Sequence, residues 1–329
     1  MRKPTRSREV GRGEKLLPGI WRLRLPLPWP GVPHCNAWAL AAGDGVVLVD
    51  TGMHEPGSML HLQRALDQAR LRIEHVRLVV CTHAHVDHCG QAPPIAEQAG
   101  CEVWMHPNHV HHTAAAADPE RALLRRIEIA RQSGVPEAPL ERWAARRRGQ
   151  GTGQAATLTV DRELTEGARV DTDLGAWRVV ETPGHAPSHI CLYQPERRLL
   201  ISGDHLLGRV SLYFDAGYTP DPVGEFLSSL DKAAGLDARL ALSGHGRPFT
   251  DVAGHITANR ALVAARLEAV REALAGGPRT AYEIAQEVYG EAFTEAMATW
   301  LLTKTRCWLI HLEWLGEASR DGGTPERWS

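Results

Sequence analysis

The chain has 329 residues, of which 43% are hydrophobic and 23% are charged, and its formal net charge at pH 7 is -2. This composition is typical of a globular protein with room for one large domain and a small one. The near-neutral charge gives none of the strongly basic surface by which a protein attracts phosphate backbones.

The first sixteen residues carry six basic side chains and no apolar stretch, which is unlike a secretory signal. We interpret residues 1–16 as a flexible basic tail. No later run reaches the roughly 18 apolar residues that a membrane span needs. The six cysteines are scattered without CxxC pairs, as is typical of reduced, buried thiols. These features predict a cytoplasmic protein with no membrane partner.

Short β-branched segments alternate with amphipathic segments through the first two-thirds of the chain. This alternation predicts an α/β layered domain over residues 17–255. The expected strands cover residues 46–50, 76–81, 178–181, 199–202 and 240–242, and the expected helices cover residues 58–69 and 92–99.

Residues 107–160 interrupt this pattern with helical, Arg-rich segments over 119–132 and 140–148, which predict a helical insertion. Its arginines either form a solvated helix face, which is favoured, or a surface for an anionic substrate. Four histidines at its start fit a solvated loop better than a further metal site: His106, His109, His111 and His112.

The pattern typical of strands is absent from residues 256–329. Their sequence predicts helices over 257–275, 281–288 and 293–315, followed by a hairpin-type turn at 321–323. Three helices and a hairpin indicate a winged-helix-like domain. The segment has eight basic and ten acidic side chains, a balance unsuited to a phosphate-binding face. Packing or homodimerisation is therefore favoured over nucleic-acid binding.

The run Thr82 to His88 contains three histidines and an aspartate directly after an expected strand. His83 and His85 are two residues apart, so in extended backbone both rings project to the same side, as ligands of one metal require. Asp87 continues the alternation, and His88 is offset toward a neighbouring position. Buried His and Asp are costly unless paired or bound to metal, so the run predicts a metal site.

Three more metal-competent side chains follow expected strands elsewhere, namely His185, Asp204 and His245. Loops at strand ends on one edge of a sheet can present several side chains to one point. The run at 82–88 supplies too few groups for two coordination shells. Together with the three distant donors, it predicts a centre for two metals.

These residues resemble those of the metallo-β-lactamase-fold hydrolases, and the resemblance spans roughly Pro18 to Pro248. It implies a four-layer αββα sandwich with the metals at one edge of the sheets. By this resemblance, His83, His85 and His185 hold the first metal. Asp87, His88 and His245 hold the second, Asp204 bridges the two, and Asp50 is a buried acidic residue that supports the site.

Two divalent ions about 3.5–4 Å apart can share a water, lower its pKa toward 7 and supply hydroxide at neutral pH. That bridging hydroxide is the expected nucleophile, with Asp87 as the catalytic group that orients it or accepts its proton. Nitrogen and oxygen ligands without a thiolate suit zinc, and manganese or iron also fits.

Asp204 at the bridging position resembles the glyoxalase II-like, lactonase-like and nuclease-like branches of the family, and the insertion and tail resemble the lactamase-beta-2-like group. The leading hypothesis is hydrolysis of a small-molecule ester, thioester or lactone. The alternative is a metal-dependent phosphodiesterase or endoribonuclease acting on single-stranded RNA. A non-enzymatic winged-helix regulator is disfavoured, because structural metals need closed ligand sets.

Overall fold

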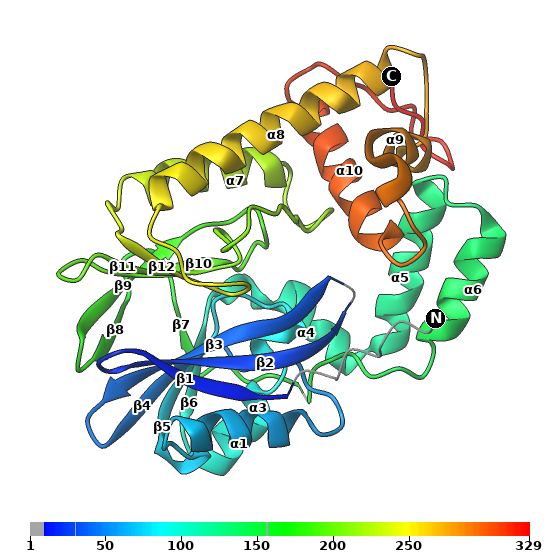
Figure 1. Cartoon of the computed structure of the whole chain (residues 1–329). Helices are drawn as coiled ribbons and strands as arrows, with labels where there is room; N and C mark the ends of the chain where they lie inside the picture. The colour runs from blue at the N-terminus through cyan, green and yellow to red at the C-terminus, as the bar shows by residue number, and fades with distance from the viewer. Residues whose placement is uncertain (1–9, 30, 156) are drawn as a thin grey trace, which may run out of the picture.

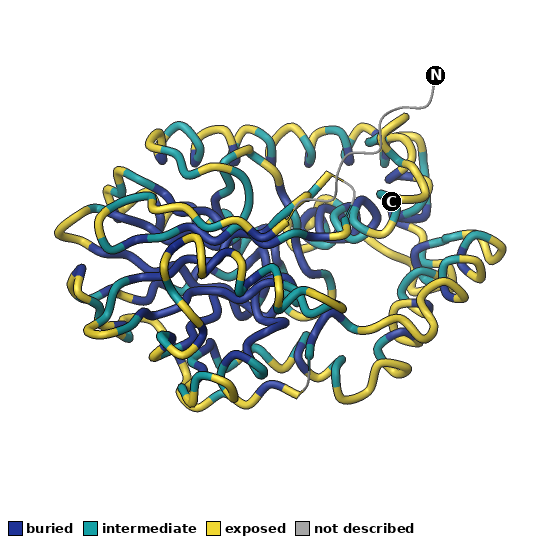
Figure 2. Tube along the Cα trace, turned by 60° about the horizontal axis from the view of Figure 1, so that its bottom comes forward, coloured by how far each residue is buried: buried dark blue, intermediate teal, exposed yellow. Residues whose placement is uncertain are grey.

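Residues 10–29, 31–155 and 157–329 are described by the computed structural model of the chain. Within them, two β-sheets lie face to face and helices cover the outer face of each sheet (Figure 1). The strand backbones in the middle of the molecule are mostly buried (Figure 2). The chain therefore adopts the α/β, four-layer αββα sandwich that the sequence predicts.

The first sheet joins seven strands in chain order among the described residues. Its first four strands pair antiparallel, and the later ones pair parallel. The strands are β1 (Arg12–Leu17), β2 (Ile20–Trp29), β3 (Val32–Ala42), β4 (Gly45–Val49), β5 (Val76–Val80), β6 (Glu102–Met105) and β7 (Arg162–Glu163).

The second sheet joins five strands in the order β12-β11-β10-β9-β8 within the same described ranges. Only β11 and β12 pair parallel; the other neighbours are antiparallel. The strands are β8 (Arg169–Thr172), β9 (Gly175–Glu181), β10 (Ile190–Gln194), β11 (Leu199–Gly203) and β12 (Leu240–Ser243).

The core between the sheets is a cluster of apolar side chains from both of them, including Trp38, Val49, Trp177 and Ile190, each at most 1% exposed. Removing such surface from water contributes about 25 cal/mol per Å². Helices α1 (Ser58–Gln68) and α3 (Ala92–Ala99) cover the outer face of the first sheet. Helices α7 (Pro222–Ala234) and α8 (Val252–Leu274) cover the second. Two short helical turns, η1 (Ile73–His75) and α2 (Val86–Cys89), flank β5.

The predicted insertion is helical where the sequence indicates it. It contains η2 (Pro107–His109), α4 (Val110–Ala117), α5 (Pro119–Gln132) and α6 (Glu137–Arg147). Asp118 caps α5 by accepting a hydrogen bond from the Arg121 backbone N–H at 3.0 Å. The insertion also reaches the C-terminal region: the backbone N–H groups of Tyr282 and Glu326 donate to the carbonyls of Ser133 and Gln132.

The C-terminal region continues from α8 into α9 (Ala281–Tyr289), η3 (Gly290–Ala292) and α10 (Ala298–Trp314). Thr280 and Glu283 form a capping box that begins α9. After α10 the described chain closes through isolated bridges that pair Trp328 with Arg320 and Arg279. A winged-helix-like domain over residues 256–329 stays a prediction.

Part of the predicted N-terminal tail forms β1, whose residues pair with β2. Residues 1–9 of that tail lie outside the described residues. Among the helices that the structure describes, none combines the length and apolar character that crossing a membrane demands.

Candidate metal centre

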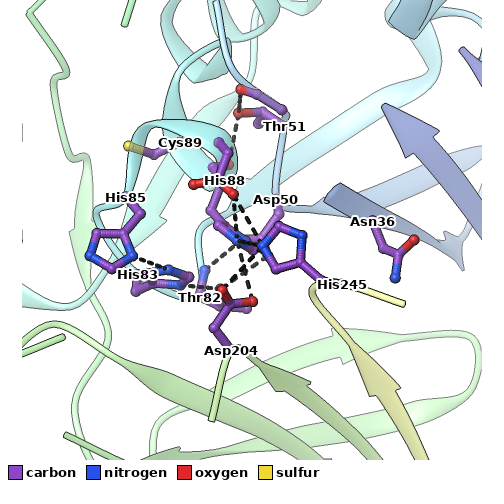
Figure 3. A network of polar contacts seen from close by, with 12 residues as sticks. Asn36, Asp50, Thr51, Thr82, His83, His85, His88, Cys89, Asp204 and His245 are labelled. Atoms are coloured by element: carbon purple, nitrogen blue, oxygen red, sulfur yellow. Dashed lines mark hydrogen bonds and ion pairs between the residues drawn. The ribbon is translucent and has the colours of Figure 1, made fainter. Parts of the chain in front are cut away.

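The seven predicted ligands lie at one edge of the sandwich, because each follows a strand whose carboxyl end reaches that edge. His83, His85, Asp87 and His88 follow β5, and the last two lie on the short helix α2. The other three follow strands of the second sheet: His185 comes after β9, Asp204 after β11 and His245 after β12. Figure 3 shows side chains from both sheets pointing toward one another.

One group of ligand atoms consists of three imidazole nitrogens. The Nε2 atom of His83 and the Nε2 atom of His185 lie 3.0 Å and 2.9 Å from Nδ1 of His85. These three atoms are close enough to bind one ion. His83 is fully buried, whereas the side chains of His185 and His85 are 6% and 12% exposed, so this group is most open to solvent near His85. We call it the three-histidine group.

A second group consists of Asp87, His88 and His245. An Oδ2 atom of Asp87 lies 3.4 Å from Nε2 of His88 and 3.1 Å from Nε2 of His245. The two imidazole nitrogens are 3.4 Å apart. Tetrahedral metal–nitrogen bonds of about 2.0–2.1 Å separate neighbouring ligand atoms by about 3.3–3.4 Å. The spacing of this aspartate–histidine group therefore fits one metal ion.

Asp204 lies between the two groups. Its Oδ1 atom is 3.4 Å from Nε2 of His88, and its Oδ2 atom is 3.1 Å from Nε2 of His245 and 3.7 Å from Nε2 of His185. Oδ1 is buried and makes no hydrogen bond within the described part of the chain. A buried carboxylate oxygen without a hydrogen bond is costly, so a cation at this point would stabilise it.

In both His185 and His245, Nε2 faces the metal centre and Nδ1 faces away from it. The hydrogen bond that Nδ1 makes determines whether Nε2 carries a proton. Nδ1 of His185 donates to the Tyr213 carbonyl at 3.0 Å, and Nδ1 of His245 donates to the His34 carbonyl at 2.9 Å. A carbonyl oxygen only accepts, and a neutral imidazole carries one N–H. When either ring is neutral, its Nε2 atom therefore presents a lone pair to the centre.

Carboxylates orient two of the other three rings directly, and the Thr82 hydroxyl orients the third. Nδ1 of His88 donates to Asp50 at 2.8 Å, and Nε2 of His85 donates to Asp215 at 2.9 Å. The Thr82 hydroxyl donates to Asp50 at 3.0 Å, and its oxygen accepts from Nδ1 of His83 at 3.0 Å. All five rings thus direct an unprotonated nitrogen inward when neutral. Lone pairs about 3 Å apart repel one another unless a cation lies between them, so these residues fit bound metal.

Asp50, which the sequence predicts as a support of the site, contacts His88 and Thr82. It is 1% exposed, and its other carboxylate oxygen accepts from the Thr82 backbone N–H at 2.8 Å. Its φ of 63° lies in the left-handed region, which Asp adopts more readily than most residues. Strained backbone of this kind persists where the surroundings hold it, and here three hydrogen bonds do so.

The loop that carries His245 is held by the first sheet. The Asn36 side chain on β3 donates to the carbonyls of Ser243 and Gly246, at 2.8 Å and 3.1 Å. Arg22 on β2 donates to the same Gly246 carbonyl. Gly244 must lack a side chain, because a Cβ there would lie 2.2 Å from Oδ1 of Asp204. The backbone itself therefore closes one side of the centre.

The pKa values differ among the histidines at the centre: burial opposes charge on His85, but Asp215 outweighs it and raises the pKa of His85. Burial lowers the pKa of His83 well below its ordinary value, and neighbouring histidines lower it further. Burial and the nearby His85 lower the pKa of His185 to about 4. Burial also opposes charge on His245, but Asp204 and Asp87 outweigh it and raise its pKa to about 10. In the metal-free protein a proton on His245 thus balances carboxylate charge that a metal would otherwise balance.

Asp215 is a site residue that the sequence does not predict, because it follows no strand and stands in no ligand-like spacing. It is 4% exposed and contacts His85 from the loop between β11 and α7. Burial raises the pKa of its carboxyl, but His85 and His112 outweigh this and hold it well below the ordinary value. Asn36 and Tyr213 are likewise unpredicted, since each acts through contacts between segments far apart in the sequence.

The predicted solvated loop at the start of the insertion is wrong for His111 and His112. Both lie on helix α4, with side chains 7% and 18% exposed, and each Nε2 atom is 3.4 Å from Asp215. The neighbouring His106 pairs instead with Glu181, at 3.3 Å. Helical backbone turns His111 and His112 inward, because α4 packs beside the site rather than standing in solvent.

Comparisons with known proteins agree with this geometry. The model of the metallo-beta-lactamase superfamily matches residues 30–245. The chain is 26% identical to the probable metallo-hydrolase YqjP of Bacillus subtilis, over 78% of this chain and 82% of that protein.

Solved structures extend the likeness to almost the whole chain. A metallo-beta-lactamase family protein from Thermus thermophilus is 29% identical, with a TM-score of 0.82 over 95% of this chain and 99% of that one. A beta-lactamase domain protein from Burkholderia ambifaria is 28% identical, with a TM-score of 0.83 over 96% and 94%. The family match, the shared fold and the histidine–aspartate site together show that this chain belongs to the metallo-beta-lactamase superfamily.

Proposed function

We propose that this metal-dependent hydrolase binds two divalent ions and cleaves a small-molecule ester, thioester or lactone. The supporting observation is the set of five imidazole nitrogens and two carboxylates that point inward and fall into two groups joined by Asp204. In this proposal the three-histidine group holds one ion and the aspartate–histidine group holds the other. Zinc suits these nitrogen and oxygen donors, and manganese or iron is the alternative.

When bound, two such ions acidify a shared water and polarise the substrate oxygen that it attacks. The residues supply orientation and proton transfer. His88 and His83 are fully buried, whereas His85 and His245 retain 12% and 15% exposure, so substrate approaches from the side of the latter two.

Asp87 is the proposed catalytic residue, because it is the carboxylate at the centre other than the bridging Asp204. Burial raises the pKa of Asp87, but His88 and His245 outweigh this and lower it. Asp87 is therefore ionised at neutral pH, and its carboxylate can accept a hydrogen bond from the attacking water and so orient it.

Acyl chemistry is favoured over cleavage of RNA because the arginines of the insertion are partly engaged within the chain. Arg131 pairs with Glu137 at 2.7 Å, Arg146 pairs with Glu295, and Arg125 lies over the ring of Tyr218. These contacts leave less positive surface for a phosphate backbone, whose binding depends on such charge.

Metal analysis of the purified protein, followed by assays of the metal-free and reloaded enzyme, tests the proposal. The substrates are a thioester, a lactone, a β-lactam, a phosphodiester and single-stranded RNA. We expect two metal equivalents and turnover of a thioester or lactone only in the reloaded enzyme. Turnover of RNA alone would overturn the acyl assignment, and activity in the metal-free enzyme would overturn the metal-dependent mechanism.

A further inference from the structure

Three imidazoles surround one carboxylate oxygen of Asp215, and the His85 ring makes a hydrogen bond to it. Its Oδ2 atom accepts from Nε2 of His85 at 2.9 Å, and the Nε2 atoms of His111 and His112 lie 3.4 Å from the same oxygen. His85 belongs to the metal centre, whereas His111 and His112 belong to helix α4 of the insertion. A single buried carboxylate therefore joins the insertion to the metal centre.

Contacts fix this junction from each side. Nδ1 of His111 donates to the Asn108 carbonyl at 2.7 Å, which sets the direction of that ring. The ring of His112 packs edge-on against the ring of His85, with centroids 4.9 Å apart. Tyr218 packs edge-on against His111, with centroids 5.0 Å apart. Asp215 is thus surrounded by aromatic rings that limit its movement.

His85 needs such a partner because it faces the centre through Nδ1, the ring nitrogen nearer its own backbone. Nδ1 can bind a metal only if the proton is on Nε2 and the ring keeps its orientation. A carboxylate that accepts from Nε2 secures both conditions and makes the ligand nitrogen more basic. Loss of the carboxylate would free the ring to place a proton on Nδ1, which would block the metal.

We propose that Asp215 is a positioning residue for His85, and that the nearby Nε2 atom of His112 and the packed ring of His111 confine Asp215 so that the helical insertion sets the metal affinity of the three-histidine group. This proposal rests on the two-metal centre proposed above but not on the identity of the substrate. It gives the insertion a role in metal binding rather than only in contact with substrate.

Titration of the metal-free full-length protein with Co²⁺, followed by visible absorption and chelator competition, tests the proposal. Asp215→Ala should weaken one of the two binding steps by about 10- to 100-fold, the range typical for lost partners of metal ligands, and leave the other step unchanged. Asp215→Asn should have a smaller effect on the same step, because an amide oxygen still accepts from Nε2 but carries no charge.

The affected step is assigned in a His245→Ala background, which leaves the three-histidine group intact. In this His245→Ala protein, the one Co²⁺ ion that still binds should bind more weakly once Asp215→Ala is added. The double variant His111→Ala and His112→Ala should weaken the same step in the otherwise natural chain. His109→Ala is the matched control, since His109 lies beside the same helix and bonds Thr113 at 3.0 Å instead.

Several outcomes would overturn the proposal. One is an unchanged titration of Asp215→Ala, and another is equal weakening of both steps. The last is binding of an additional metal ion, beyond the two expected, that Asp215→Ala abolishes, because Asp215 would then be a metal ligand itself. If Asp215→Ala fails to fold, the histidine double variant decides the question. The test uses no substrate, so it separates the two proposals. If these variants bind two metals with unchanged affinity, only the present inference is refuted. If the natural chain binds no metal, the proposed function is refuted.

Discussion

At the scale of single residues, the centre depends on hydrogen bonds that surround it rather than on the ligands alone. Each of the five inward-facing rings donates from its outer nitrogen to a carbonyl, a hydroxyl or a carboxylate. Neutral imidazole then has one nitrogen left for a metal, and its direction is set by the partner. The network around Asp50 serves His83 and His88 together, because Thr82 links them.

Removing a predicted ligand should remove metal and activity together. We expect Asp204→Ala to lower the metal content below two equivalents and the turnover by at least about 100-fold, because Asp204 faces both groups of ligands. Metal analysis and steady-state assays measure the two effects. His75→Ala is the control, since His75 ends η1 at the opposite end of β5. Full activity in Asp204→Ala would refute the site.

The raised pKa of His245 predicts how stability depends on pH when metal is absent. Its folded value of about 10 exceeds its ordinary value of 6.5. The stabilisation is therefore complete below pH 6.5 and is lost as the pH rises through about 10, by a total on the order of 5 kcal/mol. Urea denaturation in chelator at pH 6.5, 8 and 9.5 measures it. The decrease in the free energy of unfolding with rising pH should be smaller in His245→Ala than in the natural chain. An equal dependence on pH in both proteins would contradict the prediction.

At the scale of elements, the insertion is attached to the metal-binding segment at both of its ends. His111 and His112 of α4 reach Asp215 at the beginning. At the end, the chain returns past Gly90, directly after α2: the Ala155 backbone N–H donates to the Gly90 carbonyl at 2.9 Å. Movement of the insertion would therefore displace α2, the helix that carries the two proposed ligands Asp87 and His88.

Gly153 is closely packed at this return, because its φ is +87° and a Cβ would lie 2.7 Å from Met53 and 3.0 Å from Val86. Gly149 also has a positive φ, of +75°, but nothing lies within 4 Å. Both glycine-to-alanine changes should strain the backbone by about 1–3 kcal/mol. Gly153→Ala should cost about 1–3 kcal/mol more through overpacking against α2, and it should also lower turnover. Urea denaturation and steady-state assays of both variants measure this, and equal losses of stability would show that the contact with α2 is unimportant.

At the scale of the whole molecule, the C-terminal helices share a core with the second sheet. Trp308 on α10 is 1% exposed and packs edge-on against Phe214, with ring centroids 5.1 Å apart. Phe214 directly precedes Asp215 in the chain. Arg306 on the same helix donates to the Ser133 hydroxyl of the insertion at 3.0 Å. The C-terminal region thus supports both the insertion and the loop that carries Asp215.

This shared core predicts that the sandwich and the C-terminal helices unfold together. Trp308→Ala should lower the free energy of unfolding by about 3–5 kcal/mol, because it leaves a large cavity. Trp314→Ala on the same helix is the control, since Trp314 is 66% exposed and should change stability by less than about 0.5 kcal/mol. Urea denaturation followed by two spectroscopic signals should show a single transition for the natural chain. Two separate transitions would contradict a shared core.

The local pattern of the sequence was sufficient for several elements. The predicted strand at 199–202 corresponds to β11, and the helix at 119–132 corresponds to α5. The pattern missed β2 and β3, whose prolines and mixed polarity hide the alternation, and it missed α7. It also began α10 five residues early, because residues before Ala298 have apolar side chains but irregular backbone.

The local pattern predicted the fold class, and it pointed to the candidate ligands because histidine and aspartate at strand ends are local signals that need no knowledge of distant contacts. The acceptor that orients each ring, and the meeting of His111 and His112 with Asp215 beside His85, follow from the folded arrangement of distant segments. Those contacts join residues up to 211 positions apart, as in the hydrogen bond between His245 and the His34 carbonyl. No local pattern encodes them, because the packing of the two sheets and the insertion brings such residues together.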